Sequence, residues 1–317
     1  MHNTPHTVLI TGGNGNIGRM VADKLLARGQ QVVKFDIPGT EAETARTNEV
    51  VITGDVREHE KLKAILEEYQ PGAIYHLASL LSGSSEADLD AAWDINATAS
   101  FKLFHYAVET GVEQVLFAST QATYSDIDVR PMPNDQSQWP ESMYGATKVA
   151  VERLGVYFKQ KHGLDFRCLR FPMVISPFAP KTAVTGYPAH AFRAAMAGEH
   201  FSFPVSAQTG ISTMALEDVI DSIIQLSDAH RGSLTQHAYN LHAYYLNCQM
   251  IIDAIERRFP GFEYDFVIND HAQRLISSWP DEPDDSAARR DWGWQPRYDF
   301  ESSCDRLMPL LGTGLGS

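Results

Sequence analysis

The chain has 317 residues, and 44% of them are hydrophobic, which is enough for one main domain with a smaller one attached. Its 40 acidic and 26 basic residues leave a formal net charge of -14, which disfavours nucleic acid and anionic membranes as partners. No apolar run approaches the roughly 20 residues that span a bilayer. No signal-peptide pattern precedes the first expected strand, so we expect a cytoplasmic protein.

Short apolar runs alternate with amphipathic segments through the first half of the chain. In chain order, the pattern predicts a strand at 7–11, a helix at 17–28, strands at 31–35 and 49–53, a helix at 59–69, a strand at 73–77, a helix at 89–110, a strand at 115–118, a helix at 144–162 and a strand at 166–171. Apolar strands that alternate with helices are typical of a parallel sheet covered on both faces. The order predicts an α/β, Rossmann-like, doubly wound fold.

The pattern changes after residue 172, where several prolines interrupt the chain up to residue 204. Residues 198–210 look like an irregular or hairpin region, and helices are expected at 217–226 and 248–259. We predict a main domain of residues 1–175 and a smaller C-terminal substrate-binding lobe of residues 176–317, with elements from about 211–242 returning to the main sheet. The tryptophans Trp279, Trp292 and Trp294 are expected to anchor the core of the lobe.

A glycine-rich segment, TGGNGNIG, follows the first expected strand. Gly12, Gly15 and Gly18 form a GxxGxxG pattern between that strand and the next helix. Glycines let backbone N–H groups approach a pyrophosphate, and the helix N-terminus adds a favourable dipole. The pattern predicts that the main domain binds a dinucleotide.

Asp36 ends the second expected strand. A carboxylate there can accept hydrogen bonds from the adenosine ribose and repel a 2′-phosphate. None of the next three residues is Arg or Lys, so NAD is favoured over NADP. Asp55, after the third strand, is a candidate for contact with the adenine amino group.

Tyr144 and Lys148 form a YxxxK pair at the start of an expected helix. Positions i and i+4 lie on one helix face, so the phenol and the ammonium can point into one site. A nearby cation favours the phenolate, which can take a proton from a substrate hydroxyl. Thr120, just after the preceding strand, is predicted to bind the reacting oxygen, and its neighbour Ser119 is the competing candidate.

These motifs, in this order, resemble the extended short-chain dehydrogenase/reductase family, which also contains nucleotide-sugar epimerases and dehydratases. The resemblance covers essentially the whole chain. It implies an NAD cofactor, with the tyrosine as acid/base, the lysine on the nicotinamide ribose and the threonine on the substrate oxygen. It implies the cofactor-binding residues Gly12, Gly15, Asn16, Ile17, Gly18, Asp36, Asp55, Val56, Leu77, Ala78, Tyr144, Lys148 and Pro172.

Three segments resemble more specifically the short-chain type of L-threonine 3-dehydrogenase: HLASLLSG at 76–83, GLDFRCLRFPMVIS at 163–176 and SWPDEPDDSAARRDWGW at 278–294. Such enzymes oxidise the 3-hydroxyl of L-threonine with NAD and need no metal. They are usually dimers, which implies a homodimer through the helices at 89–110 and 144–162. The resemblance also implies the substrate-binding residues Ser82, Gly83, Thr120, Tyr144, Thr185, Gly186 and Trp279.

Two segments depart from that type. A TTDYA-like segment is replaced by VTGYP at 184–188, which lacks the acidic residue. A segment RLPMMYM is replaced by GISTMAL at 210–216. A closely related small hydroxy compound is therefore an alternative to L-threonine as the substrate.

Two other functions stay open. The first is a nucleotide-sugar epimerase or dehydratase, which commonly carries a diphosphate-binding arginine at the place of Ile211. The second is a non-catalytic NAD-binding regulatory protein. Such proteins usually lose the tyrosine or the lysine of YxxxK, and both are present here.

Overall fold

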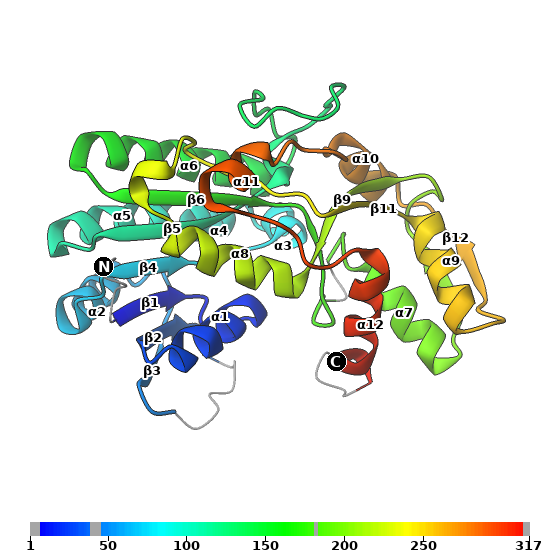
Figure 1. The fold of residues 1–317 in the computed structure, drawn as a ribbon, viewed down its shortest axis with the longest axis horizontal. Coiled ribbons are helices and arrows are strands. Elements are labelled where there is room, and N and C mark those ends of the chain that lie inside the picture. Colours follow the sequence, from blue (N-terminus) through cyan, green and yellow to red (C-terminus); the bar gives the residue numbers. More distant parts are fainter. Residues whose placement is uncertain (1–6, 39–45, 181–182, 313–317) are drawn as a thin grey trace.

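A seven-stranded parallel sheet forms the centre of the larger domain in the computed structural model, which describes residues 7–38, 46–180 and 183–312. Its strands are β1 (Thr7–Thr11), β2 (Gln31–Asp36), β3 (Glu49–Thr53), β4 (Ala73–His76), β5 (Gln114–Thr120), β6 (Asp165–Phe171) and β10 (Tyr239–Asn240). They stand in the order β10-β6-β5-β4-β1-β2-β3 (Figure 1), and every neighbouring pair is parallel. This is the order of a doubly wound Rossmann fold, so the predicted fold class is confirmed.

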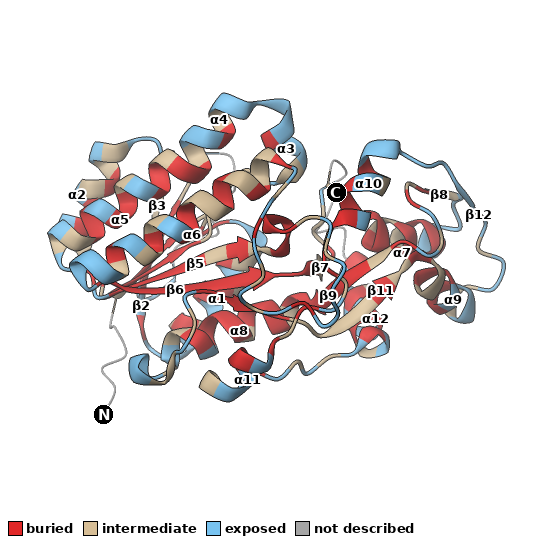
Figure 2. Ribbon diagram, turned by 90° about the horizontal axis from the view of Figure 1, so that it is seen from above, coloured by how far each residue is buried: buried red, intermediate tan, exposed pale blue. Residues whose placement is uncertain are grey.

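Helices cover both faces of this sheet, as Figure 2 shows from above. One face carries α2 (His59–Tyr69), α5 (Ala99–Thr110) and α6 (Met143–His162), and the other carries α1 (Asn16–Ala27), α8 (Leu216–Asp228) and α11 (Ser286–Trp292). Each face has its own cluster of buried side chains. In β1, Val8 and Ile10 belong to one cluster and Leu9 to the other, which explains why the strand is continuously apolar.

The smaller lobe lies beside the carboxyl ends of the main strands, since its first strand follows β6 after Pro172 alone (Figure 1). Its strands are β7 (Met173–Ile175), β8 (Phe201–Phe203), β9 (Gly210–Ala215), β11 (Tyr244–Asn247) and β12 (Tyr264–Phe266), and its helices are α7 (Tyr187–Ala197), α9 (Cys248–Arg258), α10 (Asp270–Ser278) and α12 (Phe300–Leu311). The strands form small sheets in the orders β11-β9-β7 and β12-β8. A third cluster of buried hydrophobic residues forms the core of the lobe.

The chain crosses between the two parts more than once. Residues of about 211–242 were expected to return to the main sheet. Of the elements there, α8 covers the main sheet and β10 pairs with β6, whereas β9 pairs with β7 and β11 in the lobe. The expectation for Trp292 and Trp294 was wrong, because Trp292 at the end of α11 and Trp294 just after it pack on the main-sheet cluster beside α1 and α8. Trp294 is fully buried there, and its Nε1 donates to Asp285 at 3.0 Å. Trp279 packs against the core of the lobe.

Two helical segments differ from the sequence-based expectation. The helix expected at 89–110 is α4 (Leu89–Trp93), a π-helical turn (Asp94–Thr98) and then α5, and a separate helix α3 (Ser82–Ala87) precedes it. Because of its prolines, the stretch between residues 172 and 204 was expected to contain no helix, yet α7 forms there. Pro188 stands in its first turn, where a missing N–H leaves no helical hydrogen bond unmade.

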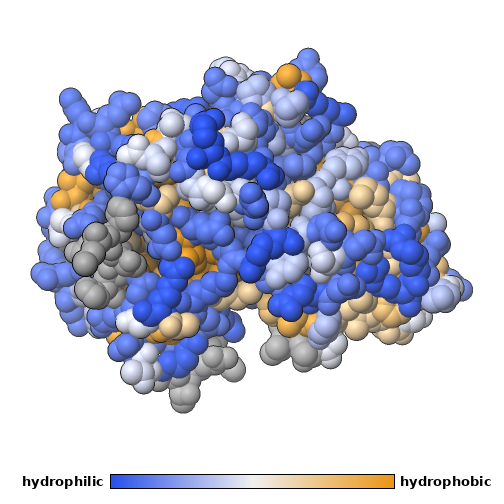
Figure 3. Space-filling model, viewed as in Figure 1, coloured by the Kyte–Doolittle hydropathy of each residue, from blue (hydrophilic) through white to orange (hydrophobic). Residues whose placement is uncertain are grey.

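Hydrophilic residues cover most of the face that Figure 3 shows. A mostly apolar cavity of about 220 Å³ is lined by α1, α8 and α12, and a polar cavity of about 1020 Å³ lies at the amino ends of the main strands. Neither is lined by a residue predicted to bind cofactor or substrate. Among the described residues, none of the helices has the length and apolar character that a membrane crossing requires.

Candidate active site

The glycine-rich loop between β1 and α1 has the shape of a pyrophosphate cradle. Gly12 has a φ of +70°, and a Cβ there would lie 2.8 Å from the backbone nitrogen of Ala78. A Cβ on Gly18 would lie 2.2 Å from the carbonyl oxygen of Gly12, so the first turn of α1 packs directly on the loop. No side chain caps α1, so the N–H groups of Asn16 and Ile17 can face a phosphate. The loop therefore fits the cofactor that the sequence predicts.

Asp36 holds this loop against the end of β2. Its carboxylate accepts the backbone N–H of Asn14 and that of Ile37, each at 2.8 Å. Asp55 is engaged differently, because the guanidinium of Arg57 donates to its carboxylate at 2.7 and 3.0 Å. These hydrogen bonds hold the pKa of Asp55 below its usual value. An adenine amino group at Asp55 would have to share the carboxylate with Arg57.

The other residues predicted to bind the cofactor follow the carboxyl ends of the strands. Leu77 and Ala78 follow β4, and Pro172 follows β6. The strand order reverses between β1 and β4, and a doubly wound sheet leaves its ligand crevice at such a point. Val56 follows β3, is 7% exposed and packs in the hydrophobic cluster under α2 and α5.

The first turn of α6 brings Tyr144 against the end of β5. Ser142 caps this helix, and its Oγ accepts the N–H of Gly145 at 3.1 Å. A Cβ on Gly145 would lie 2.2 Å from the carbonyl oxygen of Ala122, so this glycine lets the helix touch the loop after β5. The close approach brings the phenol of Tyr144 near Thr120, whose hydroxyl acts to lower the pKa of the tyrosine.

Lys148 lies one turn further along α6 and is 3% exposed. Its ammonium donates a hydrogen bond of 2.8 Å to the carbonyl oxygen of Ala118. It lies 4.7 Å from the ring centre of Phe117 and 5.5 Å from that of Tyr144. The three residues predicted to be catalytic, Tyr144, Lys148 and Thr120, thus come together at the end of β5.

Burial shifts the pKa values of this pair in opposite directions. It raises the pKa of Tyr144 to about 12, an effect that the hydrogen bond with Thr120 partly offsets. It lowers the pKa of Lys148 to about 8, an effect that the neighbouring Cys168 and Glu152 partly oppose. At neutral pH the phenol is protonated and the ammonium is charged. An additional positive charge beside Tyr144, such as that of an oxidised nicotinamide, would favour release of the phenol proton.

Thr120, rather than Ser119, presents its hydroxyl to Tyr144. Ser119 is 3% exposed, and its Oγ donates to the carboxylate of Glu152 at 2.6 Å. Thr120 Oγ1 accepts the N–H of Ala122 at 3.1 Å and contacts Tyr144. Of the two candidate hydroxyls, the geometry favours Thr120 for the substrate oxygen.

Part of the predicted substrate pocket is tied to the same helix. Ser82 and Gly83 begin α3. Glu86 of that helix accepts the N–H of Met143 at 2.7 Å, at the first residue of α6. This hydrogen bond holds α3 next to the turn that carries Tyr144.

The remaining residues predicted to bind the substrate belong to the smaller lobe. Thr185 and Gly186 precede α7, and a Cβ on Gly186 would lie 2.8 Å from Cε1 of His190. An acidic side chain at this place would require the imidazole of His190 to move. Trp279 follows α10, where the preceding carbonyl accepts the N–H of Asp126 at 2.9 Å. In the part of the chain that the structure describes, no hydrogen bond joins these side chains to Tyr144.

Three buried polar residues of the site were not expected from the sequence: Asn96, Glu152 and Arg170. The side chain of Asn96, in the π-helical turn, accepts the N–H of Leu80 at 2.8 Å and donates to Thr147 at 3.2 Å, which links the loop after β4 to α6. Turns of this type are frequent at functional sites. Glu152 stands in an expected helix and Arg170 in an expected strand, and because both charges are buried in the structure each needs a partner.

Comparisons with known proteins agree with this geometry. The model of the NAD dependent epimerase/dehydratase family matches residues 8–241. The chain belongs to this family. An uncharacterized epimerase/dehydratase of Staphylococcus saprophyticus is 32% identical over 309 residues, which are 96% of each protein.

Similar solved structures include two L-threonine dehydrogenases. That of Clostridium difficile is 27% identical with a TM-score of 0.90, over 96% of this chain and 97% of the other. That of Trypanosoma brucei is 29% identical with a TM-score of 0.89, over 97% and 98%. The predicted resemblance to extended short-chain dehydrogenases is therefore confirmed, and membership of the NAD dependent family implies a nicotinamide cofactor.

Replacing Asp36 by Asn should weaken the preference for NADH over NADPH. The ratio of the dissociation constant for NADPH to that for NADH should fall on the order of tenfold, about 1.4 kcal/mol. A neutral amide no longer repels a 2′-phosphate. Its oxygen can still accept the N–H of Asn14, so the loop keeps its support. Fluorescence titration with both cofactors measures the ratio, and Asp55→Asn should leave the ratio unchanged. An unchanged ratio in Asp36→Asn would remove Asp36 from the ribose site.

Lys148→Met should reveal the burial of the lysine charge as a pH-dependent difference in stability. The pKa of Lys148 is lowered from 10.5 to about 8 in the folded protein, so between these values the unfolded chain binds more protons. The stability of the wild type relative to Lys148→Met should therefore rise with pH across this window, by roughly 3 kcal/mol in total. Urea unfolding of both proteins at a series of pH values measures the difference, and a flat difference contradicts the assignment.

Proposed function

We propose that this chain is an NAD-dependent dehydrogenase that oxidises the 3-hydroxyl of L-threonine, or of a closely related small hydroxy compound, to the ketone. The observation that carries the proposal is the convergence of Tyr144, Lys148 and Thr120 at the end of β5. They lie on the same edge of the sheet as the glycine cradle, because the ends of parallel strands share an edge.

The roles of the three side chains follow from their chemistry. Tyr144 Oη takes the proton of the substrate hydroxyl, while the Thr120 hydroxyl hydrogen-bonds the same oxygen and holds it in place. Lys148 stabilises the phenolate by its charge and fixes its own position through the carbonyl of Ala118. NAD, when bound, accepts the hydride that leaves the substrate carbon.

The cofactor assignments are part of the same proposal. Gly12, Gly15, Asn16, Ile17 and Gly18 would hold the pyrophosphate through backbone N–H groups and close approach. Asp36 would bind the adenosine ribose, and the lack of a neighbouring basic residue favours NAD over NADP. Val56 and Asp55 would lie beside the adenine, and Leu77, Ala78 and Pro172 beside the rest of the cofactor.

Two observations favour a small hydroxy compound over a nucleotide sugar. Ile211 is 2% exposed in β9, so a buried apolar side chain occupies the place where related epimerases commonly carry a diphosphate-binding arginine. The similar solved structures named above are L-threonine dehydrogenases. The altered segments at 184–188 and 210–216 lie in the lobe that would contact the substrate, and they keep a relative of threonine as an alternative. A purely regulatory NAD-binding role is disfavoured because the tyrosine and the lysine are both in place.

We also propose that two copies of the chain pair through α4, α5 and α6. Large hydrophobic side chains on these helices are exposed, namely Leu89, Trp93, Phe101 and Tyr157, at 53%, 47%, 38% and 50%. Isolated exposed apolar residues are normal, but a group on adjacent helices marks an interface.

Purified protein with NAD should form NADH from L-threonine faster than from L-serine, 3-hydroxybutyrate or UDP-glucose, as followed by NADH absorbance. Tyr144→Phe should lower the rate on the order of 10²–10⁴-fold, the range for a lost general base. The affinity for NADH should stay largely unchanged in that variant. Tyr69→Phe on α2, remote from the site, is the matched control and should keep the full rate. Turnover of UDP-glucose alone, or NAD binding without turnover of any alcohol, would overturn the proposal.

The double variant Phe101→Asp/Tyr157→Asp should convert a dimer into a monomer, because the new charges would have to be buried in the interface. Light scattering coupled to size-exclusion chromatography measures the mass. Val267→Asp is the matched control, since Val267 is 61% exposed in the smaller lobe and should leave the dimer intact. A monomeric wild type, or a variant that stays dimeric, argues against these helices as the interface.

A further inference from the structure

A buried ion pair lies one helical turn beyond Lys148. Glu152 of α6 is 2% exposed and Arg170 of β6 is 6% exposed. The Arg170 guanidinium donates to both carboxylate oxygens of Glu152, at 2.7 Å from Nη2 and 3.0 Å from Nε. Ser119 and Gln138 also donate to this carboxylate, at 2.6 and 3.1 Å. All the polar atoms of the Glu152 side chain are therefore satisfied.

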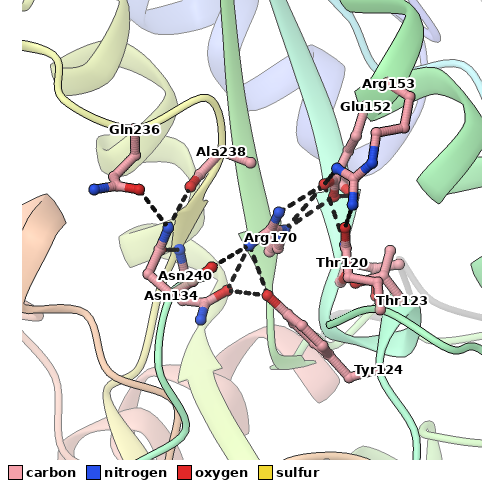
Figure 4. A network of polar contacts seen from close by, with 12 residues as sticks. Thr120, Thr123, Tyr124, Asn134, Glu152, Arg153, Arg170, Gln236, Ala238 and Asn240 are labelled. Carbon is pink, nitrogen blue, oxygen red and sulfur yellow. Dashed lines mark hydrogen bonds and ion pairs between the residues drawn. The ribbon is translucent and has the colours of Figure 1, made fainter. Parts of the chain in front are cut away.

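The pair is part of a wider network that Figure 4 shows, with Arg170 between Glu152 on one side and Tyr124 and Asn240 on the other. Arg170 Nη1 donates to the Tyr124 hydroxyl at 2.6 Å and to the carbonyl oxygen of Asn134 at 2.9 Å. The Tyr124 hydroxyl donates to Asn240 at 3.2 Å. The network thus joins α6, β6, β10 and the loop after β5.

One face of α6 meets three consecutive residues of β5. Tyr144, Lys148 and Glu152 are spaced by four residues, so they lie along that face. They contact Thr120, the carbonyl of Ala118 and the hydroxyl of Ser119, respectively. The Glu152 contact adds a third attachment of α6 to the end of β5, beyond those of Tyr144 and Lys148.

Glu152 also supplies a negative charge that favours the protonated form of Lys148. The groups that face Lys148 are Tyr144 on its own helix, His76 on β4 and Cys168 on β6. Burial lowers the pKa of His76 to about 3 and raises the pKa of the Cys168 thiol well above its usual value, so both are neutral near pH 7. The carboxylate of Glu152 therefore opposes the loss of the ammonium proton.

We propose that Glu152 is a positioning residue for the Tyr144–Lys148 pair: it attaches α6 to β5 and β6 through Ser119 and Arg170, and it places a carboxylate one helical turn from the buried Lys148. The catalytic meaning of this role rests on the proposed function, but the contact and its electrostatic effect do not. A buried ion pair is weak as a source of stability, because desolvation offsets most of its attraction. Because the Glu152–Arg170 pair joins α6 to β6 beside the site, we assign it a positioning role and not a stabilising one.

The test measures the pKa of Lys148 without cofactor or activity. The stability of each protein is compared with that of the same protein carrying Lys148→Met, as a function of pH, and the pH at which this difference begins to rise reports the pKa of the folded lysine. In the wild type it should begin near pH 8. In Glu152→Gln it should begin about half a pH unit or more lower, because a nearby opposite charge has been removed.

Three further variants separate charge from geometry. Asp165→Asn breaks a matched buried pair with Arg167, also at 2.7 Å, at the opposite end of β6, and it should destabilise the protein without moving the onset. Glu152→Asp keeps the charge and should keep the onset near the wild-type value. If Glu152→Gln does not fold, Glu152→Gln/Arg170→Gln leaves no unpaired charge and should still show the lower onset.

An onset that stays at the wild-type pH in both charge-removing variants overturns the inference. If the protein oxidises an alcohol, Glu152→Gln should also move the alkaline limb of kcat against pH to lower pH, which a purely structural defect would not do. If no alcohol is oxidised, the proposed function fails, while the stability measurement still decides the role of Glu152.

Discussion

The close contact between α6 and the carboxyl end of β5 is the constraint on which the rest of the site depends. Gly145 lets the first turn of the helix approach the carbonyl of Ala122 to a distance that no side chain would permit. Because a helix is rigid over a few turns, that approach also determines where the next two turns lie. Tyr144 reaches Thr120, and Lys148 reaches the carbonyl of Ala118. The chemistry of the site is therefore set by helix-on-sheet packing, which varies little once the core is formed.

The same packing creates the electrostatic conditions of the site. Removing Tyr144 and Lys148 from water makes the neutral forms of both more favourable, which works against a phenolate–ammonium pair. Charges placed at defined distances then have to restore the ionised forms, and in a medium of low dielectric they act strongly. One such charge is the carboxylate of Glu152, held by Ser119 and Arg170. A second such charge would be that of the oxidised nicotinamide of a bound cofactor. The polar network under the site is thus tied to the chemistry above it and not only to the stability of the fold.

The two parts of the molecule contribute different residues to the proposed site. The main domain carries the glycine cradle, Asp36 and the residues around Tyr144, all at one edge of a parallel sheet. The smaller lobe supplies Thr185, Gly186 and Trp279, and it also contains both segments that depart from the related dehydrogenases. At Gly186 the departure has a local partner, since His190 occupies the space that an acidic side chain would need. Under the proposed function, the chemistry of hydride transfer would depend on the main domain and the choice of substrate on the smaller lobe.

The sequence by itself determined the elements and the chemistry that depend on local pattern. The alternating apolar strands, the glycine loop after β1 and the YxxxK spacing each report on neighbours within a few residues. The succession of strands and helices and the common helix face of Tyr144 and Lys148 could therefore be predicted. Tertiary structure alone decided what depends on partners far along the chain. It turned Ser119 toward Glu152 and away from Tyr144, placed Trp294 on the main sheet through α11, and opened the π-helical turn that seats Asn96. A side-chain hydroxyl or a buried charge has no periodicity of its own, because its orientation follows from whichever polar group the folded chain brings within reach.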